Sequence, residues 1–312
     1  MGYIFVAIAL LSGAIKGYCG KKTSGSVSEY RDAMLVNTVR MIFCILIGFS
    51  LLALQGNLRL LAVNAKTLLI TALSGVMTSV FVVSWLLAVK KGAYMMLDVF
   101  LMLGVLVTLL LSFAVFREPI RLNQWAGMGV LLVAVIIMCS YNNSIKEKMS
   151  VMSFIILLIC GIANGLTDFS QKLFTHIIDG GNAAVFNFYT YIFSALTLAV
   201  CYAGAGHGNK APGRGGRILK EIFWYVLVMS VCLFMNSFFK TKAATYLTSA
   251  QLYPLNQGCG LMLSSVMAGA FFSEKTTAHG VMAALFFKEK LTAKCVIGLI
   301  TAFAGLLIIN LL

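Results

Sequence analysis

A chain of 312 residues in which 60% are hydrophobic and 11% are charged, with a mean hydropathy of +0.94, does not have the composition of a soluble domain. Such a domain carries roughly 25% charged residues. The formal net charge of +14 would suggest nucleic-acid binding in a soluble protein. Here most Lys and Arg residues lie between apolar blocks, where they are typical of membrane insertion and headgroup contacts, so we expect no nucleic-acid partner.

The apolar blocks are about 18–25 residues long, which is enough to cross roughly 30 Å of hydrocarbon. They lack the alternation of a membrane barrel, and helices are then the remaining way to satisfy the backbone in lipid. The sequence therefore predicts an all-α integral membrane protein with ten transmembrane helices. In chain order the blocks are 2–19, 33–54, 67–89, 93–116, 124–141, 150–174, 183–204, 221–243, 249–272 and 295–312. The connector 205–220, rich in Gly and basic residues, indicates a flexible basic loop.

The two halves of the sequence resemble each other. Gly13 and Gly17 match Gly161 and Gly165 at one common shift, and Gly104 and Glu118 match Gly260 and Glu274 at another. Five helices in each half is an odd number, so the halves must enter the membrane from opposite sides. We predict two inverted five-helix repeats, at 1–142 and 150–312. Secondary transporters commonly have this architecture, with the substrate site between the halves.

A second, local repeat lies near the end of the chain. Residues 266–278 recur in altered form 15 residues later, within the segment 266–295. The apolar stretch 280–287 is too short to span a bilayer. We therefore expect an interfacial or partly re-entrant helix there, and we interpret the repeat as a tandem duplication at a surface turn, with a gate as the alternative.

One motif occurs twice: an acidic residue closes an apolar helix, and a short polar turn leads into an apolar helix containing Gly. It reads Phe116-Arg-Glu118-Pro-Ile-Arg-Leu-Asn-Gln-Trp-Ala-Gly127 and again Phe287-Lys-Glu289-Lys-Leu-Thr-Ala-Lys-Cys-Val-Ile-Gly298. With this motif the whole chain resembles the EamA type of the drug/metabolite transporter (DMT) superfamily. The resemblance implies a ten-helix permease that works by alternating access without nucleotide hydrolysis. The chain departs from the family pattern by the duplication, by Lys16 within a membrane helix, and by Gly104 where many members have Pro.

Ionisable side chains inside a bilayer cost a few kcal/mol or more, so each one is a candidate for function. Lys16 lies between Gly13 and Gly17, on the small-residue face through which helices approach each other. Arg40, Asp98 and Asp168 are the other candidates for substrate binding. Alternatively, Arg40 and Asp98 reach the interface, and Lys16 forms a structural pair with Asp168 or Asp98. We interpret Lys240 and Lys242 as headgroup contacts.

Polar and aromatic side chains complete the predicted substrate-binding residues. A kinked helix around Pro254 that carries several amides suits recognition of a polar solute, although single amides more often bridge helices. The remaining candidates are Trp85, Asn164, Asn187, Tyr191, Asn236, Gln251, Asn256 and Gln257.

These features predict a secondary transporter of a small polar metabolite, anionic or zwitterionic because Lys16 and Arg40 are the deepest charges of the first half. The alternatives are a proton-coupled cation or drug exporter using Asp98 and Asp168, and a non-transporting, lipid-handling subunit. We expect no enzyme activity, catalytic residue, metal or cofactor. The expected partners are a small-molecule substrate and the bilayer, with a homodimer compatible, and the expected location is the plasma (inner) membrane.

The orientation in the membrane has two predictions. Most basic residues of the connectors lie on the side opposite the termini, which by the positive-inside rule places both termini outside. The family resemblance instead implies cytoplasmic termini.

Overall fold

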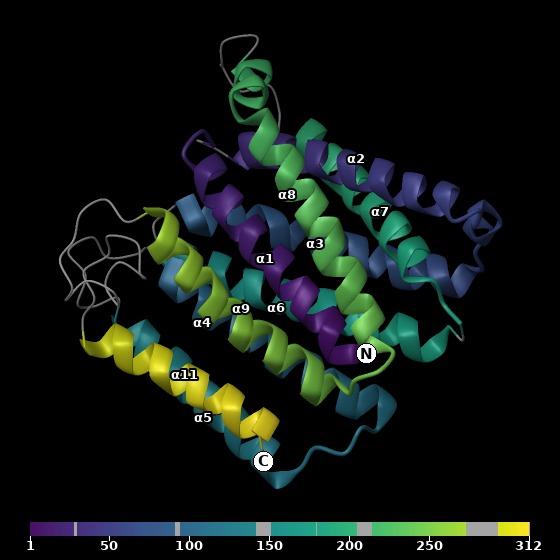
Figure 1. Ribbon diagram of the computed structural model, residues 1–312. Coiled ribbons are helices and arrows are strands. Elements are labelled where there is room, and N and C mark those ends of the chain that lie inside the picture. Colours follow the sequence, from purple (N-terminus) through teal and green to yellow (C-terminus); the bar gives the residue numbers. More distant parts are fainter. Residues whose placement is uncertain are drawn as a thin grey trace.

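A computed structural model describes residues 1–27, 30–90, 94–141, 151–178, 180–204, 214–272 and 293–311 (Figure 1). Within these ranges all regular elements are helical. They are α1 (Gly2–Ser24), α2 (Tyr30–Leu54), the 3-10 helix η1 (Leu58–Leu61), α3 (Ala65–Lys90), α4 (Tyr94–Phe116), α5 (Leu122–Tyr141), α6 (Val151–Ile177), α7 (Ala183–Gly204), α8 (Arg214–Ala244), α9 (Ser249–Phe272) and α11 (Ala293–Leu311).

Each apolar block of the sequence overlaps one of these helices, and the predicted block 249–272 coincides with α9. One prediction was wrong. α8 begins at Arg214, inside the segment 205–220 that we expected to be a loop. The first turns of α8 carry Lys220 and Glu221, so the apolar block begins later than the helix. The local duplication at 266–295 falls largely outside the described residues.

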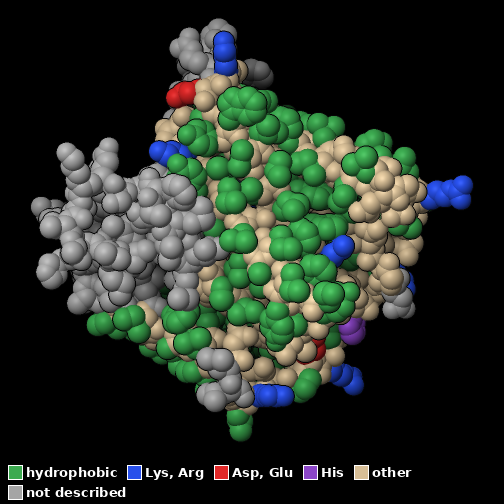
Figure 2. Space-filling model, in the orientation of Figure 1, with side chains coloured by type: hydrophobic (Ala, Val, Ile, Leu, Met, Phe, Trp, Pro, Cys, Tyr) green, Lys and Arg blue, Asp and Glu red, His purple; other side chains and the backbone are tan. Residues whose placement is uncertain are grey.

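Seven helices in the described part of the chain are long and apolar enough to cross a membrane: α1, α2, α3, α4, α6, α7 and α8. The surface agrees with this, because large apolar side chains such as Leu69, Val200 and Trp224 are more than 70% exposed. Figure 2 shows hydrophobic side chains covering the middle of one face, with most Lys and Arg near its margins. A surface of this kind suits lipid better than water.

The helices pack in a defined set of pairs. α1 packs along α8, and α3 packs along α6. α6 also contacts α4, and α1 also contacts α9. α2 packs against α7, and α5 against α11 (Figure 1). The core therefore forms where helices of the first half meet helices of the second.

The crossing of α4 and α6 depends on three glycines. A Cβ on Gly161 would lie 2.2 Å from the carbonyl oxygen of Phe100, and one on Gly165 would lie 2.4 Å from the carbonyl oxygen of Gly104. A Cβ on Gly104 would in turn lie 2.7 Å from the carbonyl oxygen of Gly161. The two backbones are thus close enough that any side chain at these positions would separate them.

Glu118, the acidic residue of the family-like motif, connects three helices at one end of the bundle. Its carboxylate lies 3.4 Å from Nζ of Lys172 near the end of α6. The second carboxylate oxygen accepts a hydrogen bond from the backbone N–H of Ser249, the first residue of α9, at 3.2 Å. A carboxylate at a helix N-terminus is stabilised by the unpaired N–H groups and the helix dipole. The motif therefore positions the end of α4 against α6 and α9.

Candidate functional site

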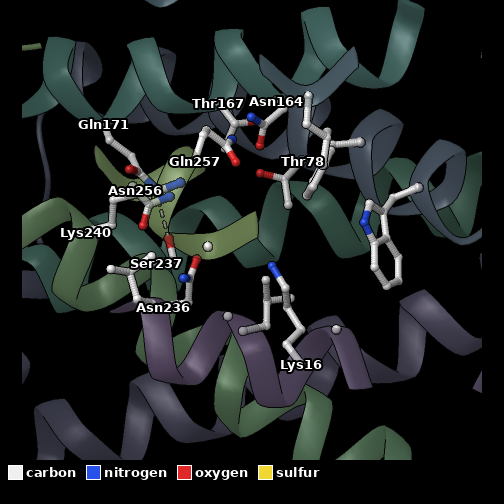
Figure 3. Close-up of a pocket in the computed structure, with 18 of the residues that line it drawn as sticks. Lys16, Thr78, Asn164, Thr167, Gln171, Asn236, Ser237, Lys240, Asn256 and Gln257 are labelled. Atoms are coloured by element: carbon white, nitrogen blue, oxygen red, sulfur yellow. Dashed lines mark hydrogen bonds between the residues drawn. The ribbon is translucent and has the colours of Figure 1, made fainter. Parts of the chain in front are cut away.

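A polar cavity of about 140 Å³ lies where α1, α3, α6, α8 and α9 converge (Figure 3). This volume is close to the ~150 Å³ of a cavity that admits benzene, so the space suits a solute of a few heavy atoms. The lining residues are Leu10, Gly13, Lys16, Gly17, Thr78, Phe81, Trp85, Leu101, Asn164, Thr167, Gln171, Tyr191, Leu233, Asn236, Ser237, Lys240, Asn256, Gln257 and Gly260.

Lys16 enters the cavity from α1. Figure 3 shows its side chain pointing into the cavity, with Thr78, Asn164 and Gln257 on the opposite side. The ammonium lies 6.0 Å from the ring centroid of Phe81, a cation–π contact. Among the described residues no carboxylate forms an ion pair with Lys16. The cavity therefore contains a positive charge that the described side chains leave without a counter-ion.

A second lysine in the wall has a counter-ion. Lys240 on α8 forms a charge-assisted hydrogen bond with the carboxylate of Asp168 on α6, and these residues are 6% and 1% exposed. Our interpretation of Lys240 as a headgroup contact was wrong, because its side chain turns inward between α6 and α8. The structural alternative from the sequence paired Lys16 with Asp168 or Asp98. Among the described ion pairs, the partner of Asp168 is Lys240 instead.

A chain of hydrogen bonds fixes the polar wall around this pair. Gln171 donates through Nε2 to Ser237 Oγ at 3.2 Å, and Ser237 donates to Asn187 Oδ1. Asn187 completes the chain by donating to the carbonyl oxygen of Ala183 at 2.8 Å. Tyr253 adds a bond from its hydroxyl to the carbonyl oxygen of Asp168 at 2.7 Å. α6, α7, α8 and α9 are thereby connected on one side of the cavity.

Other lining side chains also have fixed partners. Asn236 donates to the carbonyl oxygen of Ala9 at 2.6 Å, and Tyr191 donates to that of Leu233 at 3.2 Å. A Cβ added to Gly20 would lie 2.4 Å from the ring of Trp85, so the lack of a side chain at Gly20 leaves the space that the indole occupies. These groups shape the cavity, while part of their bonding capacity is already used.

Four polar atoms of the lining residues lack a hydrogen-bond partner among the described residues. They are Thr78 Oγ1, Asn164 Nδ2, Gln171 Oε1 and Asn256 Oδ1. A buried polar atom that lacks a hydrogen bond costs about 1–3 kcal/mol. The two amide oxygens need donors, so a bound solute that supplies N–H or O–H groups would satisfy them.

Seven predicted site residues line the cavity: Lys16, Trp85, Asn164, Tyr191, Asn236, Asn256 and Gln257. Others lie elsewhere. Arg40 is 2% exposed and donates to Asn37 Oδ1 at 2.5 Å. Asn187 and Asp168 stand behind lining residues, as the bonds above show. Gln251 is exposed at the start of α9, where its Oε1 accepts from the N–H of Thr248. The side chain of Asp98 is outside the described residues.

Five polar lining residues were not among the predicted site residues: Thr78, Thr167, Gln171, Ser237 and Lys240. Helical spacing could have indicated some of them. Lys240 follows Asn236 by four residues, and Gln171 follows Thr167 by four, so each pair shares a helix face. Both helices thus present a polar stripe to the interior. We had assigned Lys240 from its nearness to the helix end alone.

Within the described residues no group of three or more His, Cys, Asp or Glu side chains is arranged to hold a metal ion. The site is therefore defined by ammonium, amide and hydroxyl groups.

Comparison with known proteins gives a family and a fold. The EamA-like transporter family matches residues 1–140, and this family belongs to the DMT superfamily. No curated protein matches the chain. One solved structure, described only as a crystal structure of a protein, has a TM-score of 0.60 and 13% sequence identity. The likeness covers 99% of this chain and 96% of that one, and at this identity it shows a shared fold alone.

Proposed function

We propose that this multi-pass membrane protein, whose residues 1–140 belong to the EamA-like transporter family, is a secondary transporter of a small anionic or zwitterionic metabolite. Its solute would bind in the cavity at Lys16 and cross the plasma (inner) membrane by alternating access. The ten helices would form two inverted five-helix repeats. A homodimer is compatible with this proposal.

The position of Lys16 carries the proposal. An ammonium within a membrane helix is costly unless it is paired, yet no described carboxylate pairs with it. A solute with an anionic group would provide that pair. Its N–H or O–H groups would meet the free amide oxygens of Gln171 and Asn256. The cavity volume of about 140 Å³ limits the solute to a few heavy atoms.

The helix pairs support the inverted repeat. If α1 corresponds to α6 and α3 to α8, then the α1–α8 pair corresponds to the α6–α3 pair, and both are extensive. By the same rule, α4–α6 corresponds to α9–α1, and α3–α7 to α8–α2, which are all contacting pairs. A two-fold relation of this kind gives a carrier two equivalent gates on opposite sides.

The two repeat-related glycine crossings differ, as alternating access requires. At α4–α6 the backbones meet at Gly104, Gly161 and Gly165. At α1–α9 the matched positions line the cavity, and a Cβ on Gly260 would meet only Leu10 at an ordinary 3.6 Å. We infer that transport exchanges these states, so that the second crossing closes when the first opens.

The cation-exporter alternative has less support, because Asp168 is already paired with Lys240. A non-transporting, lipid-handling subunit would not need a polar cavity of this kind.

Uptake into proteoliposomes tests the proposal. Purified protein would be assayed with labelled small carboxylates, amino acids and permanent cations, alongside Lys16→Gln and the control Lys242→Gln. Lys242 is exposed and does not line the cavity. We expect uptake of an anion or zwitterion that Lys16→Gln abolishes and Lys242→Gln keeps. Uptake restricted to cations and unaffected by Lys16→Gln would contradict the proposal.

A further inference from the structure

A second cavity, of about 360 Å³, lies on the other side of α3 from the polar one. α3 forms its floor through Ser79, Val83 and Leu87, whereas Thr78, Phe81 and Trp85 of the same helix face the polar cavity. The walls come from α2 and α7 on one side and α6 on the other. The two cavities therefore share one helix and lie on opposite faces of it.

The wall of this second cavity offers almost nothing to a polar solute. Its three serine and threonine hydroxyls donate to carbonyl groups of their own helices: Ser79 to Gly75, Ser84 to Val80, and Thr197 to Phe193. The rest of the wall consists mainly of Val, Leu, Ile and Met side chains. A cavity of this chemistry does not hold ordered water. It would instead gain dispersion contacts from hydrocarbon.

The cavity opens to the outside of the helix bundle. Met152, Ile155 and Ile159 of α6 line it and are 59%, 44% and 43% exposed. These apolar residues belong to a helix that is long enough to span a membrane, so the exposed surface beside the cavity is one that lipid would cover. The volume is more than twice that of the ~150 Å³ cavity that admits benzene. Part of a fatty acyl chain would fit into it.

A cation lies next to the mouth. Tyr30 and Cys201 line the cavity, and their neighbours Arg31 and Tyr202 stack with the guanidinium carbon 4.9 Å from the ring centroid. Nε of Arg31 is buried and has no hydrogen-bond partner among the described residues. No described carboxylate forms an ion pair with Arg31. Guanidinium groups bind phosphate strongly through paired N–H donors.

From this juxtaposition we infer that the groove between α2, α6 and α7 is a binding site for an anionic phospholipid. One acyl chain occupies the apolar cavity over α3, and the phosphate of the headgroup is bound by Arg31. Lys21 and Lys22 lie in the last turn of α1, shortly before α2 begins along the chain. Basic residues at a membrane surface attract anionic lipids.

Native mass spectrometry of delipidated protein tests this site. The protein would be titrated with phosphatidylglycerol, phosphatidylcholine and glycerophosphoglycerol, which has the same headgroup without acyl chains. We expect one tightly bound phosphatidylglycerol per chain and weaker binding of phosphatidylcholine. Glycerophosphoglycerol should not compete with phosphatidylglycerol for the site. Arg31→Gln should lower the affinity for phosphatidylglycerol at least about fivefold, since a basic residue near anionic lipid contributes about 1 kcal/mol.

Matched variants test the acyl-chain cavity and the phosphate contact of Arg31 independently. Ser84→Leu fills the cavity and should displace the acyl chain. Leu69→Phe changes an exposed position on the same helix outside the cavity and should bind lipid as the wild type does. Arg59→Gln removes an exposed cation elsewhere, and Lys16→Gln alters only the polar cavity, so both should retain the lipid. The inference would be overturned if Arg31→Gln and Ser84→Leu bound phosphatidylglycerol as tightly as the wild type does. Displacement of phosphatidylglycerol by glycerophosphoglycerol would also overturn it. A circular-dichroism melt confirms that each variant is folded.

Discussion

The ammonium of Lys240 on α8 is paired with the carboxylate of Asp168 on α6, and both residues are buried beside the polar cavity. Removing one member of a buried pair typically costs about 3–5 kcal/mol, whereas replacing both by apolar residues is often neutral. The stability of the wall therefore depends on both members of the pair, Lys240 on α8 and Asp168 on α6.

We expect Lys240→Met to lower the free energy of unfolding by about 3–5 kcal/mol, because Asp168 then lacks its counter-ion. The double variant Lys240→Met/Asp168→Leu should recover most of this loss. Thermal denaturation in detergent measures both. Lys242 is an exposed lysine on the same helix, so Lys242→Met is the control and should change the free energy of unfolding little. A single variant as stable as wild type would show that the pair does not stabilise the wall.

Glycine substitutions at two positions should have effects of opposite sign. Gly161→Ala places a Cβ 2.2 Å from the carbonyl oxygen of Phe100, so α4 and α6 must separate. We expect a loss of about 1–3 kcal/mol, as for other overpacked sites. Gly129→Ala meets nothing within 4 Å and gains helix propensity of up to about 1 kcal/mol. A Gly161→Ala variant with the melting temperature of the wild type would contradict the close α4–α6 crossing, and a lowered melting temperature of Gly129→Ala would contradict the open space at that position.

Two substitutions at Glu118 distinguish the stability that its ion pair contributes from the stability that its helix cap contributes. Glu118→Gln removes the charge facing Lys172 but keeps an oxygen for the N–H of Ser249. Because the Glu118 and Lys172 side chains are 26% and 11% exposed, we expect a loss below about 1 kcal/mol. Glu118→Ala also removes the cap and should cost about 1–2 kcal/mol in total. Denaturant titration that finds equal losses would show that the cap contributes nothing.

Orientation can be read from labelling of a single cysteine. A variant with the native cysteines replaced would carry one new cysteine at Asn209, in the connector before α8. The positive-inside rule predicts that this site faces the cytoplasm. A membrane-impermeant thiol reagent should then label it only in broken cells. Labelling in intact cells would instead support the cytoplasmic termini that the family resemblance implies.

The helices could be predicted from the sequence because their length is set by the bilayer. Blocks such as 249–272 match α9 for this reason. The start of α8 could not be placed in the same way, since the residues from Arg214 to Glu221 include four charged side chains and the helix begins before the apolar block. Hydropathy identifies the part of a helix that lies in lipid and does not define its ends.

The cavity could be predicted only in part. Lys16 was indicated by the glycines beside it, and Asn256 and Gln257 by the polar content of their helix. Arg40 looked equivalent to Lys16 in depth, but it points to Asn37 and away from the cavity lining. Burial alone does not determine which interior face a residue occupies. That depends on the rotation of each helix, which is set by packing against partners distant in the sequence.

Ligand-dependent thermal stability of the purified protein is the most direct test of the central claim, that Lys16 binds the anionic group of a small solute. Wild type, Lys16→Gln and Lys242→Gln would be melted with panels of small anions, zwitterions and cations. A bound ligand at 100 times its Kd stabilises by about 2.7 kcal/mol. We predict stabilisation by an anion or zwitterion in wild type and Lys242→Gln that is lost in Lys16→Gln. Stabilisation by cations alone, retained in Lys16→Gln, would contradict the account.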